Sequence, residues 1–178
     1  MISRNGIFQK STKTFSKVAD QQLFHSIYEL HYQQVFRLCK GYFNGDESTA
    51  ADATQEVFLK VWQHLATFRG EAKMSTSLYR IAVNTCLSFL RKPAAKKEIK
   101  TEELPDVAAE AYNPLMEERL YKMYRCIQQL DETGKVIILM VLEGLDYSAI
   151  AEVVGMSEDT LRVRIHRIKK QLTNCVQQ

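Results

Sequence analysis

The sequence predicts an all-α protein built from two small helical domains joined by a flexible acidic linker. Only 7 Gly and 3 Pro occur among 178 residues, so long stretches contain no helix-breaking residue. The alternation of apolar and polar residues that is typical of strands is nearly absent. Apolar residues instead recur at helical spacing, in segments separated by turn-forming residues. A chain of this length has room for one ordinary domain or two small ones.

The composition is that of a soluble globular protein, with 46% hydrophobic and 25% charged residues. A formal net charge of +3 is too small to indicate nucleic-acid binding by itself. Residues 1–20 contain no apolar run of the kind found in signal peptides, and the apolar run over residues 136–142 is too short to span a bilayer. We therefore expect a cytoplasmic protein.

Four cysteines stand far apart in the chain, and none belongs to a Cys-x-x-Cys motif. In a reducing cytosol, such residues are usually buried or half-buried free thiols, rather than metal ligands or disulfides. We expect free thiols at the following positions: Cys39, Cys86, Cys126 and Cys175.

The N-terminal half reads as a flexible arm followed by a three-helix domain. Residues 1–19 are rich in Ser, Thr and Lys and form the expected arm. The domain covers residues 20–92, with a first helix that starts at the potential N-cap Asp20 and ends before an Asn-Gly-Asp turn at residues 44–46. Further helices are expected over about 48–65 and 76–92, and Pro93 ends the last one.

Residues 93–114 are expected to form the linker. Few large apolar residues occur there, the three prolines fall within or beside it, and a basic stretch gives way to an acidic one. A second domain then covers residues 115–178, with helices expected over about 115–130, 135–143, 147–154 and 158–173.

The last two of these helices have the pattern of a helix-turn-helix motif. Gly155 suits a tight turn that needs positive φ, and Ser157 can cap the helix that follows. One narrow stripe of that helix is apolar and is expected to face the core: Leu161, Ile165, Ile168 and Leu172. The opposite face is largely basic, as a reader of the DNA major groove requires: Arg162, Val163, His166, Arg167 and Lys170, with Arg164 at its edge. The alternative is a solvated basic face on an ordinary surface helix.

The helix predicted over residues 48–65 has a core stripe and an unusual outer face. The core stripe contains Ala50, Ala53, Val57, Phe58, Val61 and Leu65. An apolar residue and a tryptophan stand beside carboxylates on the outer face, which indicates a partner surface: Asp52, Gln55, Glu56, Leu59 and Trp62. Alternatively, the first helix or the arm covers Trp62.

The loop over residues 67–76 and the helix after it combine cations, an amide and an aromatic residue. These groups can contact phosphates, read base edges and stack on bases, so they are the ingredients of a single-strand binding site. The candidate residues are Phe68, Arg69, Gly70, Lys73, Arg80, Asn84 and Arg91. The same residue types are also common on any polar helix.

Several motifs in order resemble the extracytoplasmic-function (ECF) sigma factors of bacterial RNA polymerase. DATQEVFLKVW at residues 52–62, FRGE at 68–71 and LYRIAVN at 78–84 are similar to the family's region two. Leu130-Asp131, EGLDYSAIA at 143–151 and the basic last helix are similar to its region four. The resemblance covers about residues 20–92 and 115–175.

The resemblance implies a factor that binds core RNA polymerase and directs promoter-specific initiation of transcription. It assigns polymerase docking to the outer face with Leu59 and Trp62, capture of a flipped −10 base to the loop and Asn84, and −35 recognition to the basic face of the last helix. It also implies that the linker threads the RNA path of the polymerase, and that a membrane-linked anti-sigma factor covers the docking surfaces.

Two other functions are compatible with parts of this pattern or have to be compared with it. A stand-alone helix-turn-helix regulator would bind a palindromic operator as a dimer, without polymerase. An enzyme is not indicated, because no nucleotide-binding or nucleophile motif occurs and the four histidines are scattered: His25, His31, His64 and His166. We expect no catalytic activity, no metal, no cofactor and no small-molecule substrate.

Overall fold

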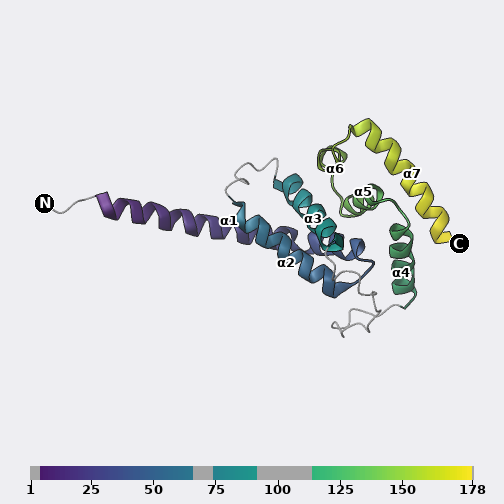
Figure 1. The fold of residues 1–178 in the computed structure, drawn as a ribbon, viewed down its shortest axis with the longest axis horizontal. Coiled ribbons are helices and arrows are strands. Elements are labelled where there is room, and N and C mark those ends of the chain that lie inside the picture. Colours follow the sequence, from purple (N-terminus) through teal and green to yellow (C-terminus); the bar gives the residue numbers. More distant parts are fainter. Residues whose placement is uncertain (1–4, 66–73, 92–113, 178) are drawn as a thin grey trace.

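The computed structural model describes the backbone of residues 5–65, 74–91 and 114–177, and the side chains of residues 19–65, 74–91 and 118–177. Within these ranges the chain forms helices and no strand, which confirms the predicted all-α class. The helices, drawn in Figure 1, are α1 (Asn5–Tyr42), α2 (Glu47–Gln63), α3 (Met74–Arg91), α4 (Pro114–Gln128), α5 (Glu132–Leu142), α6 (Tyr147–Val154) and α7 (Glu158–Gln177).

The first helix is longer than predicted. It begins at Asn5 rather than at Asp20, and its N-terminal part extends away from the other helices (Figure 1). The sequence predicts a flexible arm over residues 1–19, whereas residues 5–19 belong to α1 in the structure. The physical reason is that neither Gly nor Pro occurs between Gly6 and Gly41, so nothing in the sequence stops the helix at Asp20.

Helices α1, α2 and α3 enclose the core of the N-terminal domain. The predicted core stripe is buried as expected, from Ala50 on α2 to Leu65 just beyond the end of that helix. It packs against Ile27, Val35 and Leu38 of α1 and against Leu78 and Ala82 of α3, among others. The turn before α2 places Asn44 and Gly45 at positive φ, and the Asp46 side chain accepts a hydrogen bond from the Thr49 amide, which fixes the start of α2.

Helices α4 to α7 form the C-terminal domain. Gly155 has the positive φ that the turn between α6 and α7 requires, and the Thr160 amide donates to Ser157 Oγ at 3.3 Å. The predicted apolar stripe of α7 faces the core, with Leu161, Ile165 and Ile168 buried. The sequence therefore predicts the helix-turn-helix correctly.

A disulfide joins Cys126 of α4 to Cys175 near the end of α7, so the prediction of free thiols is wrong for this pair. It is confirmed for Cys39 and Cys86, which are buried thiols. The spacing of the cysteines in the sequence does not predict this disulfide. The two bonded residues are 49 positions apart, and only the packing of α7 on α4 brings them together. Closing a loop of this length stabilises the folded chain by roughly 4 kcal/mol in the chain-entropy picture.

The two domains pack directly against each other, which the sequence did not predict. Helix α5 lies against α1, and α6 lies against α3. Leu139 of α5 sits so close to Gly41 of α1 that a Cβ at Gly41 would overlap its side chain. Beside this contact, Gln128 Nε2 donates to the carbonyl oxygens of Gly41 and Tyr42, at 3.2 and 3.1 Å.

Charged groups surround this apolar contact. Arg37 donates to both carboxylate oxygens of Glu143, at 2.7 to 3.1 Å, and the Glu143 side chain is only 8% exposed. The Tyr42 hydroxyl donates to Glu132, and this hydrogen bond lowers the pKa of the Glu132 carboxyl. The nearly buried carboxylate of Glu143 therefore has its charge partner in the other domain.

In the parts of the chain that the structure describes, no helix is long and apolar enough to cross a bilayer.

Replacing Gly41 by Val should separate the two domains. The added side chain overlaps Leu139 Cδ2, which belongs to a buried residue of α5, and overpacking of this kind costs about 1–3 kcal/mol. Small-angle scattering should show a larger radius of gyration, while circular dichroism should show unchanged helix content. The control is Gln33→Val, the same new residue at an exposed position of α1. An unchanged radius of gyration for Gly41→Val would contradict the packing described here.

Candidate partner and nucleic-acid surfaces

The outer face of α2 carries the predicted partner surface. Asp52, Gln55, Leu59 and Trp62 are exposed, and Glu56 is half-buried. Leu59 is 55% and Trp62 is 42% exposed, and the two are neighbours on one helix face, so together they form an exposed apolar patch of the kind found at interaction sites.

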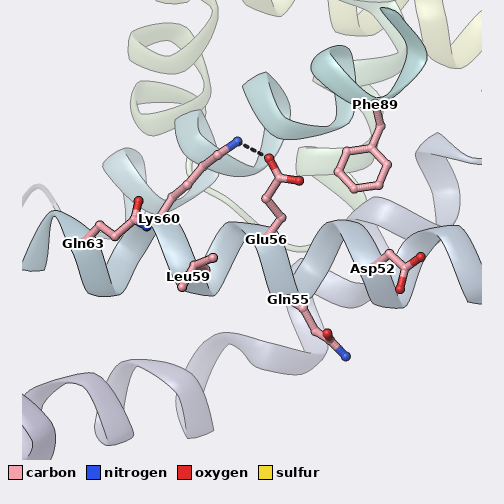
Figure 2. Close-up of a pocket in the computed structure, with 7 residues that line it drawn as sticks. All are labelled: Asp52, Gln55, Glu56, Leu59, Lys60, Gln63 and Phe89. Atoms are coloured by element: carbon pink, nitrogen blue, oxygen red, sulfur yellow. Dashed lines mark ion pairs between the residues drawn. The ribbon is translucent and has the colours of Figure 1, made fainter. Parts of the chain in front are cut away.

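A groove of about 740 Å³ runs along this face, and Figure 2 shows its lining residues. Four of the five predicted residues line it: Asp52, Gln55, Glu56 and Leu59. Helix α2 forms one wall, and Phe89 of α3 stands on the other side (Figure 2). We refer to this feature as the α2 groove.

Sequence reasoning missed three lining residues of the α2 groove: Lys60, Gln63 and Phe89. Lys60 has a positional role, since its ammonium group lies 2.9 Å from Glu56 Oε1 and donates to Thr85 Oγ1 of α3 at 3.0 Å. It thereby ties the Glu56 carboxylate to α3. The i, i+4 spacing of Glu56 and Lys60 is the signal that could have found this pair.

Trp62 lies beside the groove and does not line it. Its ring meets Phe24 of α1 edge-on, with ring centroids 5.2 Å apart. The first helix therefore covers part of Trp62, as the alternative reading held, but leaves much of the indole open to solvent.

The candidate single-strand site is described only in part. Arg80, Asn84 and Arg91 are exposed on α3, whereas Phe68, Arg69, Gly70 and Lys73 lie outside the described residues. Arg80 is engaged by the other domain: its guanidinium donates to the Glu152 carbonyl of α6 at 2.9 Å and lies 3.9 Å from the Glu152 carboxylate.

The basic face of α7 is open to solvent. The side chains of Arg162, Val163, His166, Arg167 and Lys170 are exposed. Arg162 pairs with Glu158 at 3.3 Å, and its guanidinium lies over the Tyr147 ring, 5.3 Å from the centroid. These contacts hold Arg162 at the junction of α6 and α7.

Arg164 differs from the other basic residues of α7. Its guanidinium donates to Asp131, the residue whose other carboxylate oxygen accepts from the Gly134 amide and caps α5. Arg164 therefore connects α7 to the start of α5, as its place at the edge of the basic face allows.

Among the described residues, no group of His, Cys, Asp and Glu could hold a metal ion.

Comparison with known proteins agrees with this geometry. Residues 27–96 match the family described as Sigma-70 region 2, and residues 120–172 match Sigma-70 region 4. The ECF RNA polymerase sigma-E factor of Escherichia coli (strain K12) is 33% identical over 172 residues, covering 89% of this chain and 88% of that protein. The sigma-E factor of Haemophilus influenzae is 31% identical, covering 89% of each chain.

Two solved structures share the fold. CnrH, in complex with the cytosolic domain of CnrY, has a TM-score of 0.68 and 18% identity, and the match covers 88% of this chain and 89% of that one. The sigma factor RpoE of Bartonella quintana, in complex with the anti-sigma factor NepR, has a TM-score of 0.69 and 17% identity, with 86% and 96% covered. With both sigma regions present in order and close sequence relatives across most of its length, the chain belongs to the ECF sigma factors, which direct RNA polymerase to promoters to initiate transcription.

Proposed function

We propose that the α2 groove and Trp62 dock on core RNA polymerase. The observation that carries this proposal is the α2 groove itself, because an open, partly apolar hollow coincides with four of the five residues expected to dock. Leu59 and Trp62 supply apolar area that a partner can bury, and Asp52 and Gln55 supply polar atoms at the rim. The carboxylate of Glu56 is already held in place by Lys60, so binding need not order it.

The α7 helix is proposed to read the −35 element in the major groove. Its exposed cations can neutralise phosphates, and arginine can donate two hydrogen bonds to a guanine edge. Arg167 and Lys170 lie opposite the buried stripe of Ile165 and Ile168, so they point away from the domain core. Arg164 is assigned a smaller role in DNA contact, because its guanidinium is bonded to Asp131.

The −10 element is proposed to contact α3 through Arg80, Asn84 and Arg91, together with the loop that holds Phe68, Arg69, Gly70 and Lys73. A shaped pocket for one extruded base would offset the few kcal/mol that unstacking costs. Arg80 cannot contact DNA while it donates to Glu152, so this contact has to open first. Polymerase that binds only the separated domains would shift the chain toward that open state.

An anti-sigma factor is proposed as a second partner. CnrH was solved in complex with the cytosolic domain of CnrY, and the Bartonella RpoE in complex with the anti-sigma factor NepR. A partner that covers Leu59 and Trp62 would compete directly with polymerase.

We further propose that the protein acts in the cytoplasm, has no catalytic activity of its own and needs no cofactor. A stand-alone dimeric regulator is not favoured, because the chain carries region 2 as well as region 4.

The double variant Leu59→Ala, Trp62→Ala should bind core polymerase at least about tenfold more weakly, because truncating central apolar anchors typically costs more than 1 kcal/mol each. The measurement is the dissociation constant for core polymerase by fluorescence anisotropy of a labelled factor. Leu30→Ala is the matched control, since Leu30 is 69% exposed on α1 outside the α2 groove. If the double variant folds normally and binds as tightly as the control, α2 is not the docking face.

Arg167→Ala should weaken initiation at promoters that depend on their −35 element by roughly tenfold, in line with the loss of one major-groove contact. Run-off transcription on paired promoters with intact and scrambled −35 elements measures the effect. Lys169→Ala removes the same charge from an exposed position of α7 outside the predicted set. Equal losses for the two variants, or a parallel loss of polymerase binding, would refute the assignment of Arg167.

A further inference from the structure

The disulfide between Cys126 and Cys175 lies outside the sets of residues proposed for docking and promoter reading. It links α4 to the last turns of α7, the helix that carries the −35 candidates. Structural disulfides are rare in a reducing cytosol, where those that do form usually act as reversible redox elements. A disulfide in a protein proposed to be cytoplasmic is therefore expected to form and break reversibly.

We propose that Cys126 and Cys175 form a reversible thiol–disulfide site that fastens the C-terminal end of α7 to α4, with a low-molecular-weight disulfide as oxidant. The proposal rests on the geometry of the C-terminal domain and on the proposed cytoplasmic location. It holds whether or not the docking and promoter assignments are correct.

The two sulfurs differ in access, which sets the order of the reaction. Cys126 is 4% exposed, whereas Cys175 is half-buried near the chain end, with its Sγ 3.8 Å from Gln129 Oε1. The Cys175 thiolate attacks the small disulfide, forming a mixed disulfide and releasing one thiolate. The Cys126 thiolate then attacks Cys175 Sγ and releases the second. The two protein thiols are oxidised, their two protons pass to the released thiolates, and one small disulfide becomes two thiols.

The position of the bond decides what it controls. Leu161, Ile165 and Ile168 are buried and hold the first part of α7 on the core. Beyond them, only Leu172, Cys175 and Val176 have half-buried side chains. The end of α7 therefore depends on the covalent link, and reduction leaves its last turns with little buried apolar surface.

A second cysteine pair provides an internal comparison. Cys39 of α1 and Cys86 of α3 have their Sγ atoms 3.6 Å apart, and both are fully buried. The hydrogen bond to Cys39, together with burial, raises the pKa of the Cys86 thiol. These two thiols are close enough to react with each other, but a dissolved oxidant cannot reach them. Access, rather than proximity, should decide which pair is oxidised.

Titration of the reduced full-length chain with oxidised glutathione tests the site. After alkylation of the remaining thiols in denaturant, mass spectrometry of peptides should find Cys126 linked to Cys175, with Cys39 and Cys86 alkylated. A link between Cys39 and Cys86 in place of this one would overturn the proposal, as would four alkylated thiols at every glutathione ratio.

Hydrogen exchange then tests the consequence. Amides of residues 171–177 should exchange at least about tenfold more slowly in the oxidised chain than in the reduced chain, and α2 amides should not change. The Cys175→Ser variant should match the reduced chain under both conditions. The Cys86→Ser variant should keep the redox difference. Equal exchange at the end of α7 in oxidised and reduced wild-type protein would show that the bond does not fasten the helix.

Discussion

The close approach of Leu139 to Gly41 is the tightest apolar contact described here between the two domains of this sigma factor. It brings α5 onto the end of α1, where no side chain at position 41 keeps the helices apart. The polar contacts of Gln128, Tyr42 and Glu132 lie around this point and add to the same interface. The packing of α6 on α3, with the bond from Arg80 to Glu152, is the second part of the domain contact.

The surfaces proposed to bind polymerase and promoter DNA lie away from this interface, apart from Arg80. The α2 groove opens on the outer side of the N-terminal domain, and the basic face of α7 opens on the outer side of the other domain. Each surface stands on a helix whose opposite side is buried in a core. Such a surface is rigid before its partner arrives, so little conformational entropy is lost on binding. A protein that works by positioning DNA on another enzyme benefits from this rigidity.

Much of this organisation could be predicted from the sequence, because it follows from local patterns. The spacing of Ala53, Val57 and Val61 identified the buried face of α2, and Gly155 followed by Ser157 identified the turn before α7. Features that depend on long-range packing could not be read in this way. The pairing of Cys126 with Cys175 and the bond from Arg37 to Glu143 join residues that share no sequence pattern, and Phe89 enters the α2 groove from a different helix. The early start of α1 was missed because a good capping residue, Asp20, also fits inside a helix.

Among the residues that the structure describes, two ion pairs cross the domain interface, and they differ in how strongly dissolved salt acts on them. Arg80 and Glu152 are both about half exposed, so dissolved salt screens their attraction, whereas the Glu143 side chain is only 8% exposed and its pairing with Arg37 is screened much less. Rising ionic strength therefore weakens the contact of α3 with α6 more than the contact of α1 with α5. Salt acts first on the contact that holds Arg80, one of the residues proposed to meet the −10 element.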